Sequence, residues 1–168
     1  MNRRKLKDHH EGSILKSFED YLKKDGKLMV IKERPDPPDA LVTINSKDTW
    51  IEITDAFFNK EHARSITSYV ADDMEHIPAD GGPYIEPDAN FERNVEIVVT
   101  KKYTKSSIRS IYQKNGSGIL LVGLYSPFAA TNEIQALVKI VSELKAESDG
   151  RFREIYLYDQ SHNFYPVK

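Results

Sequence analysis

The chain has 168 residues, of which 39% are hydrophobic and 30% charged, so its length suits one domain with a single core. It contains no cysteine, which excludes disulfides, thiolate catalysis and cysteine-bound zinc, and no apolar run approaches the roughly 18–20 residues that span a membrane. Lys and Arg number 24 against 26 Asp and Glu, and the resulting net charge of −2 argues against strong non-specific binding to nucleic acid.

The N-terminal residues predict a basic arm followed by a helix. Residues 1–8 carry four basic side chains and one acid, and we expect a short mobile arm there. This region lacks the apolar stretch of a secretory signal, and we expect a cytoplasmic protein. A helix is expected from His9 to Lys24, where Asp25-Gly26 ends it. One face of this helix would carry a stripe that consists of Glu11, Leu15, Phe18 and Leu22.

The next segment predicts three strands, of which the last two form a hairpin. Residues 28–31 are apolar, residues 39–44 follow a proline-rich interruption, and residues 49–54 follow a short polar turn. Side chains alternate between the two faces of a strand. One face of the last run therefore carries Trp50, Glu52 and Thr54.

The remaining sequence predicts alternating helices and strands. Residues 77–93 contain three prolines and two glycines, which are typical of a long irregular connection. Helices are expected over 61–74, 101–114 and 132–145, and strands over 95–99, 118–124, 154–158 and 163–167. This order predicts an α/β fold, with a mixed central sheet flanked by helices, as a single domain over residues 1–168.

Two acids in the predicted hairpin indicate chemistry. Asp39 and Glu52 each lie on a strand-like run with few other charges, and a hairpin would bring them together near one end of the sheet. Two neighbouring carboxylates resist joint ionisation unless a cation joins them. Mg²⁺ prefers such oxygen ligands and keeps several waters for a substrate and a nucleophile. The hairpin therefore predicts a magnesium site.

The same residues resemble a known group of nucleases, the PD-(D/E)XK nuclease-like superfamily with its restriction-endonuclease-like fold. That family has an acid on its first helix, a Pro-Asp at the start of one strand and an acid-x-Lys triplet on the next. The matching residues here are Glu11, Pro38-Asp39 and Glu52-Ile53-Thr54. The resemblance implies that Asp39 and Glu52 bind Mg²⁺, or Mn²⁺ in its place, and that Glu11 assists through a water or the metal. It implies hydrolysis of DNA or RNA, and it is compatible with a homodimer.

The sequence departs from this family at Thr54, which stands where the family has lysine. A threonine hydroxyl can hold a water but offers no permanent positive charge. Some members of the family supply the lysine from a neighbouring helix, and Lys101 and Lys105 are the candidates here because they lie one turn apart on a predicted helix.

Other interpretations stay open. Without a lysine, the fold would serve as a catalytically inactive binding module for a protein or nucleic acid, such as an immunity-type or assembly factor. Alternatively, the chain is an unrelated α/β domain in which Asp39 and Glu52 lie far apart. Two further expectations concern single residues: His10 is a solvated residue near the terminus, and Asp55 caps the segment that follows it.

Overall fold

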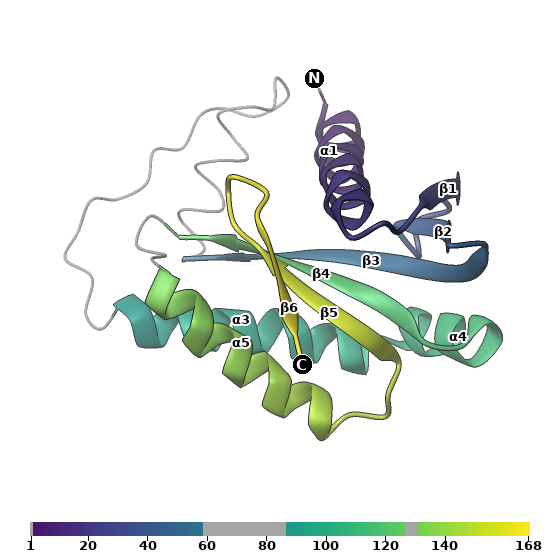
Figure 1. Ribbon diagram of the computed structural model, residues 1–168. Coiled ribbons are helices and arrows are strands. Elements are labelled where there is room, and N and C mark those ends of the chain that lie inside the picture. The colour runs from purple at the N-terminus through teal and green to yellow at the C-terminus, as the bar shows by residue number, and fades with distance from the viewer. Residues whose placement is uncertain (1, 59–86, 127–130) are drawn as a thin grey trace.

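The computed structural model describes residues 2–58, 87–126 and 131–168, and in these residues the chain forms one six-stranded sheet with helices on both faces. The strands lie in the order β1-β2-β3-β4-β5-β6 (Figure 1). The central strands β3, β4 and β5 are parallel, and the outer pairs are antiparallel. The strands are β1 (Met29–Glu33), β2 (Ala40–Ile44), β3 (Lys47–Phe57), β4 (Gly118–Tyr125), β5 (Phe152–Tyr158) and β6 (Phe164–Val167). The predicted α/β class with a mixed sheet is confirmed.

The helices form a layer on each side of the sheet. The helix α1 (Arg3–Lys24) lies on one face, while α3 (Pro87–Thr104) and α5 (Thr131–Ala146) lie side by side on the other (Figure 1). The short helix α4 (Ser106–Asn115) follows α3 and leads into β4. Among the described helices, none combines the length and the apolar character that a membrane span requires.

Each face of the sheet packs against its helical layer through an apolar core. Along β3, Ile51 and Ile53 belong to the core under α1, whereas Trp50 and Ala56 belong to the core under α3 and α5. This alternation is the period of two that a strand imposes. The strand β4 is buried on both faces, as its continuous apolar sequence predicts. The sheet is therefore a rigid central layer against which both helical layers are fixed.

The helix α1 begins earlier than the sequence suggests. The side chain of Asn2 accepts a hydrogen bond from the backbone nitrogen of Lys5 at 3.0 Å, which is the bond of a helix N-cap. The helix therefore begins at Arg3 rather than near His9, and the basic residues 3–8 form its first turns. It ends at the predicted place, because Gly26 adopts a φ of +72°, which favours glycine.

The expected strand over residues 95–99 is wrong, because these residues lie inside α3. Val95 and Val99 are four residues apart and both are fully buried against the sheet. Burial of this helical face outweighs the weak preference of β-branched residues for strands. The helix begins at Pro87 and so includes the end of the expected irregular connection. The expected helix over 61–74 and residues 77–86 lie outside the described residues.

The expected helix over residues 101–114 is divided into the end of α3 and the helix α4. The break falls at Lys105, whose backbone is extended with φ −69° and ψ 123°. The chain thereby changes direction directly after the C-terminal turn of α3. This break leaves the last turn of α3 beside β3, where the predicted acids lie.

Candidate active site

The hairpin of β2 and β3 brings Asp39 and Glu52 together. The antiparallel register pairs Ala40 with Ile51, so Asp39 stands opposite Glu52 just beyond the last paired residue of β2. Because β2 ends here, the backbone nitrogen of Ile53 donates to Oδ2 of Asp39 at 2.7 Å instead of to a strand. Asp39 is 4% exposed and Glu52 is 2% exposed. The interpretation in which these two acids lie far apart is therefore excluded.

The helix α1 adds the third predicted acid. Glu11 is buried, and its carboxylate contacts the guanidinium of Arg34 at 3.0 Å and the ammonium of Lys7 at 3.4 Å. The same Lys7 ammonium lies 4.0 Å from Oδ1 of Asp39. Lys7 thus links Glu11 on the helix to Asp39 on the sheet. The structure gathers the three acids that the sequence singled out, each from a different element.

The lysine of the site is Lys102, rather than Lys101 or Lys105. Its Nζ lies 2.6 Å from Oε1 of Glu52, and its side chain is 16% exposed. Lys101 and Lys105, the predicted candidates, are exposed, although the charge of Lys105 also opposes the rise of the Glu52 pKa. The reason is the face of α3: Val95, Val99 and Lys102 follow at spacings of four and three, and Lys102 extends the buried stripe to the end of the helix.

Thr54, the residue at the family's lysine position, is half-buried on β3. It lies two residues beyond Glu52 and therefore on the same face of the strand. Its predicted role, which is to hold a water beside the acids, stays a prediction. On the same face, the ammonium of Lys102 contacts Glu52 from the helix α3.

The two glutamates of the site, Glu52 and Glu11, have raised pKa values. Burial, followed by the negative charge of Asp39, raises the pKa of Glu52 above its ordinary value, and the ammonium of Lys102 opposes this rise. The same two causes raise the pKa of Glu11 to about 7, against the opposing charges of Lys7 and Arg34. Burial thus outweighs the neighbouring cations at both glutamates, so that each resists ionisation.

These residues fit a hard divalent cation held by oxygen. The atom Oε2 of Glu52 is buried and has no hydrogen-bond partner among the described residues, and Oδ1 of Asp39 points toward Lys7 rather than to the backbone. No cluster of three or more acidic or histidine side chains arranged to hold a metal occurs in residues 2–58, 87–126 and 131–168. Asp39 and Glu52 would therefore hold Mg²⁺ as a pair and leave its other positions to water.

The raised pKa of Glu11 predicts that stability falls as the pH rises. Between pH 4.5, its ordinary pKa, and about 7, the folded protein keeps a proton that the unfolded chain has released. We expect Glu11→Gln, which stays neutral, to exceed the wild type in unfolding free energy by about 1–3 kcal/mol at pH 8, and the difference to shrink toward pH 4.5. Urea unfolding of both proteins across this range measures it, and parallel pH curves would contradict the prediction.

A second polar cluster lies next to the acids and was missed from the sequence. His10 is not simply solvated, because its Nε2 lies 2.9 Å from Oδ2 of Asp55, and the other oxygen of Asp55 accepts from the hydroxyl of Tyr158 at 2.5 Å. The bond to Asp55 raises the pKa of His10. Asp55 therefore ties α1 to β3 and fixes the helix that carries Glu11; the chain from residue 59, which Asp55 is predicted to cap, lies outside the described residues.

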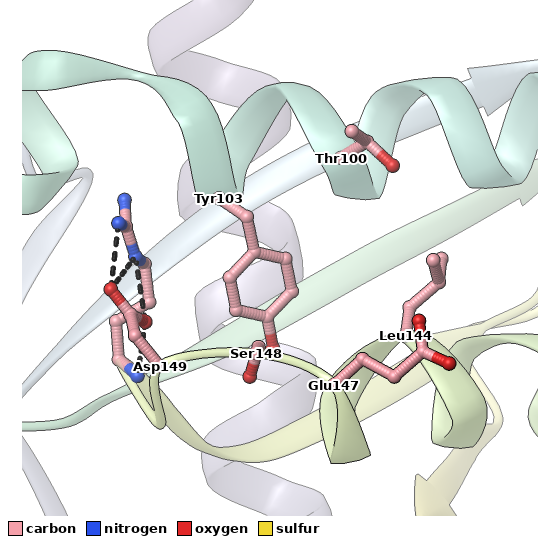
Figure 2. Close-up of a pocket in the computed structure, with 7 residues that line it drawn as sticks. Thr100, Tyr103, Leu144, Glu147, Ser148 and Asp149 are labelled. Carbon is pink, nitrogen blue, oxygen red and sulfur yellow. Dashed lines mark hydrogen bonds and ion pairs between the residues drawn. The ribbon is translucent and has the colours of Figure 1, made fainter.

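A pocket of about 360 Å³ lies between the end of α3 and the turn before β5 (Figure 2). Tyr103 points into it toward Ser148, and Arg151 is clamped by Asp149 with an Nη2–Oδ2 distance of 2.8 Å. Nη1 of Arg151 also donates to the backbone carbonyl of Lys102 at 3.5 Å. The pocket is separate from the acids, but Arg151 braces the turn of α3 that presents Lys102.

Comparisons of the chain with family models, with curated proteins and with solved structures found no match. A functional assignment therefore depends on the residues and the geometry of this site.

Proposed function

We propose that the protein is a Mg²⁺-dependent phosphodiesterase of the PD-(D/E)XK type that hydrolyses nucleic acid. The observation that carries the proposal is the group of the buried Asp39 and Glu52 with the half-buried Lys102, which come from the residue before β2, from β3 and from α3. Two carboxylates beside one ammonium match the acids and the lysine of that family, although the lysine comes from a helix. A metal ion bound by the two acids would polarise a phosphoryl oxygen and lower the pKa of a bound water.

The chain's own residues have distinct tasks in this proposal. Asp39 is oriented by the backbone nitrogen of Ile53 at 2.7 Å, which leaves its second oxygen for the cation. Lys102 donates to Glu52 at 2.6 Å and can equally donate to a phosphate oxygen or an attacking water beside it. Thr54 holds a water on the same face of β3. By donating to a phosphate oxygen, Lys102 stabilises the negative charge that develops on the phosphate.

The surroundings of the acids favour a polyanionic substrate. Lys7, Arg34 and Lys105 lie around the site, and Lys7 and Lys105, together with Lys102, act on the carboxylate of Asp36 at its rim. The hydrogen bond from Lys7 is the main cause that lowers the pKa of Asp36. The overall charge of −2 therefore conceals a local concentration of cations, which suits phosphate groups.

A cleavage assay tests the proposal. Purified protein is expected to nick DNA or RNA in the presence of Mg²⁺ and not in the presence of EDTA. Asp39→Ala and Glu52→Ala should each abolish the activity, because each removes one of two metal ligands. Asp48→Ala, which changes an exposed acid on the same hairpin, is the matched control and should retain it. Cleavage that survives both site substitutions would refute the assignment of the site.

A second candidate function is a catalytically inactive binding module of the same fold. The observation that favours it is that Lys102 and Lys7 already neutralise part of the acid cluster without a metal. The two candidates differ in their response to Mg²⁺. A ligand that binds the folded state alone raises the melting temperature, so stabilisation by millimolar Mg²⁺ that is lost in Asp39→Ala supports the enzyme, whereas no stabilisation supports the module.

A further inference from the structure

The ammonium of Lys7 lies among three carboxylates, those of Glu11 on α1 and of Asp36 and Asp39 in the connection between β1 and β2. Its Nζ is 2.9 Å from Oδ2 of Asp36, 3.4 Å from Oε1 of Glu11 and 4.0 Å from Oδ1 of Asp39. Glu11 and Asp39 are buried, whereas Asp36 is exposed on the loop between β1 and β2. Lys7 therefore lies between the buried acids and the surface. It faces Oδ1 of Asp39, whereas Oδ2 accepts from the backbone nitrogen of Ile53.

Lys7 and Lys102 hold the acids in different ways. Lys102 is 16% exposed and makes one short contact of 2.6 Å with Glu52. Lys7 is 50% exposed, and its contacts with the buried acids are longer than its contact with Asp36. An exposed lysine in long contacts is held weakly, because water screens the charges and competes for the ammonium. Lys7 is thus the cation that can leave the site.

Asp36 gives Lys7 a second position at the rim. Both oxygens of Asp36 accept from the ammonium, at 3.0 Å and 2.9 Å. The loop is fixed by a bond from the backbone nitrogen of Asp36 to the carbonyl of Pro38 at 2.9 Å, next to Asp39. An ammonium that moves away from Asp39 and Glu11 can therefore stay paired with Asp36 outside the acid cluster.

We propose that Lys7 is an internal counter-cation, which neutralises Asp39 and Glu11 in the metal-free protein and is displaced toward Asp36 when a divalent ion binds. This inference rests on the proposed function, because it assigns the regulation of the same metal site. A fixed positive charge within about 4 Å of a cation site opposes binding by Coulomb repulsion. Lys7 therefore sets the metal concentration at which the site fills.

A titration with Mn²⁺, in the absence of nucleic acid, tests the inference. Free Mn²⁺ is followed by electron paramagnetic resonance in the full-length wild type and in Lys7→Met, which keeps the apolar stem and removes the charge. The dissociation constant of Lys7→Met is expected to be about tenfold lower than that of the wild type. Lys7→Arg keeps the charge and should not bind more tightly. Lys16→Met, which removes an exposed ion-paired lysine of the same helix, should match the wild type.

The outcomes separate this inference from the proposed function. Equal dissociation constants for Lys7→Met and the wild type, both lost in Asp39→Ala, would overturn the inference and leave the metal site standing. No Mn²⁺ binding by any variant would overturn the proposed function itself, and the inference with it. A gain in Lys7→Met that persists when Asp39→Ala is added would also overturn the inference, because the ion would then lie elsewhere.

Acylation of lysines provides a second measurement on the wild type. An acetylating reagent reacts with the neutral amine, and Lys7 loses its proton more readily once it moves away from Glu11 and Asp39, because both carboxylates raise its pKa. Mass spectrometry should therefore show faster acetylation of Lys7 with Mg²⁺ than without it, relative to Lys16 in the same sample. An unchanged ratio at a Mg²⁺ concentration that saturates the site would overturn the displacement of Lys7.

Discussion

Replacing Lys102 with Met is expected to reduce Mg²⁺-dependent cleavage by about 10²–10⁴-fold, the range for loss of a group that stabilises transition-state charge. Lys102 is the buried ammonium that contacts Glu52 at 2.6 Å. Thr54 cannot replace it, because its hydroxyl carries no charge. The measurement is single-turnover cleavage at saturating Mg²⁺, with the folded fraction of each protein checked by circular dichroism.

The adjacent lysine provides the control for this experiment. Lys101→Met removes the same charge one residue earlier on α3, from an exposed position. It should change the cleavage rate by less than about threefold, which is the scale of a surface charge. If Lys101→Met lost activity while Lys102→Met kept it, the lysine would be misassigned. Equal losses would indicate a general effect of charge on substrate binding rather than a catalytic ammonium.

The location of Lys102 shows why the sequence predicted two acids of the site but not its lysine. Asp39 and Glu52 follow from one local fact, the hairpin, because a short turn fixes the register of two strands. Lys102 depends on the phase of α3, which is set by burial of Val95 and Val99 against the sheet. The β-branched run at 95–99 is typical of a strand. When it is interpreted as a strand, the helical spacing that places Lys102 on the same face as Val95 and Val99 cannot be recognised.

The contacts of Lys7 and His10 could not be predicted from the sequence either, because they also depend on how distant elements pack. Both residues belong to the first turns of α1: Lys7 lies in residues 1–8, where the sequence suggests a mobile arm, and His10 lies at the start of the expected helix. Their partners, Asp36 and Asp55, follow at separations of 29 and 45 residues. Such pairs form only after the layers are assembled, so no local pattern indicates them. The strands were more predictable, because alternation and turns are local.

The core beneath the site depends on one close contact between strands. Gly118 begins β4, and a methyl group on it would lie 2.3 Å from two carbons of the Trp50 indole. Trp50 is fully buried, and its Nε1 donates to the carbonyl of Gly116 at 2.8 Å. The backbone of Gly118 is itself fixed, because its nitrogen donates to the carbonyl of Arg151 at 2.8 Å. Neither side of this contact can move without losing a hydrogen bond.

Gly118→Ala is therefore expected to lower the unfolding free energy by about 2–4 kcal/mol, the upper range for overpacking a core. Gly12→Ala is the matched control: it lies inside α1, and the nearest atom to its new methyl group is Nη1 of Arg34 at 3.5 Å. Because alanine favours a helix over glycine, this control should gain up to about 1 kcal/mol. Urea unfolding measures both, and a Gly118→Ala protein as stable as the wild type would contradict the packing.

Trp50 lies two residues before Glu52 on the same face of β3. A displaced indole would therefore also shift the carboxylate that Lys102 contacts, and cleavage should fall together with stability.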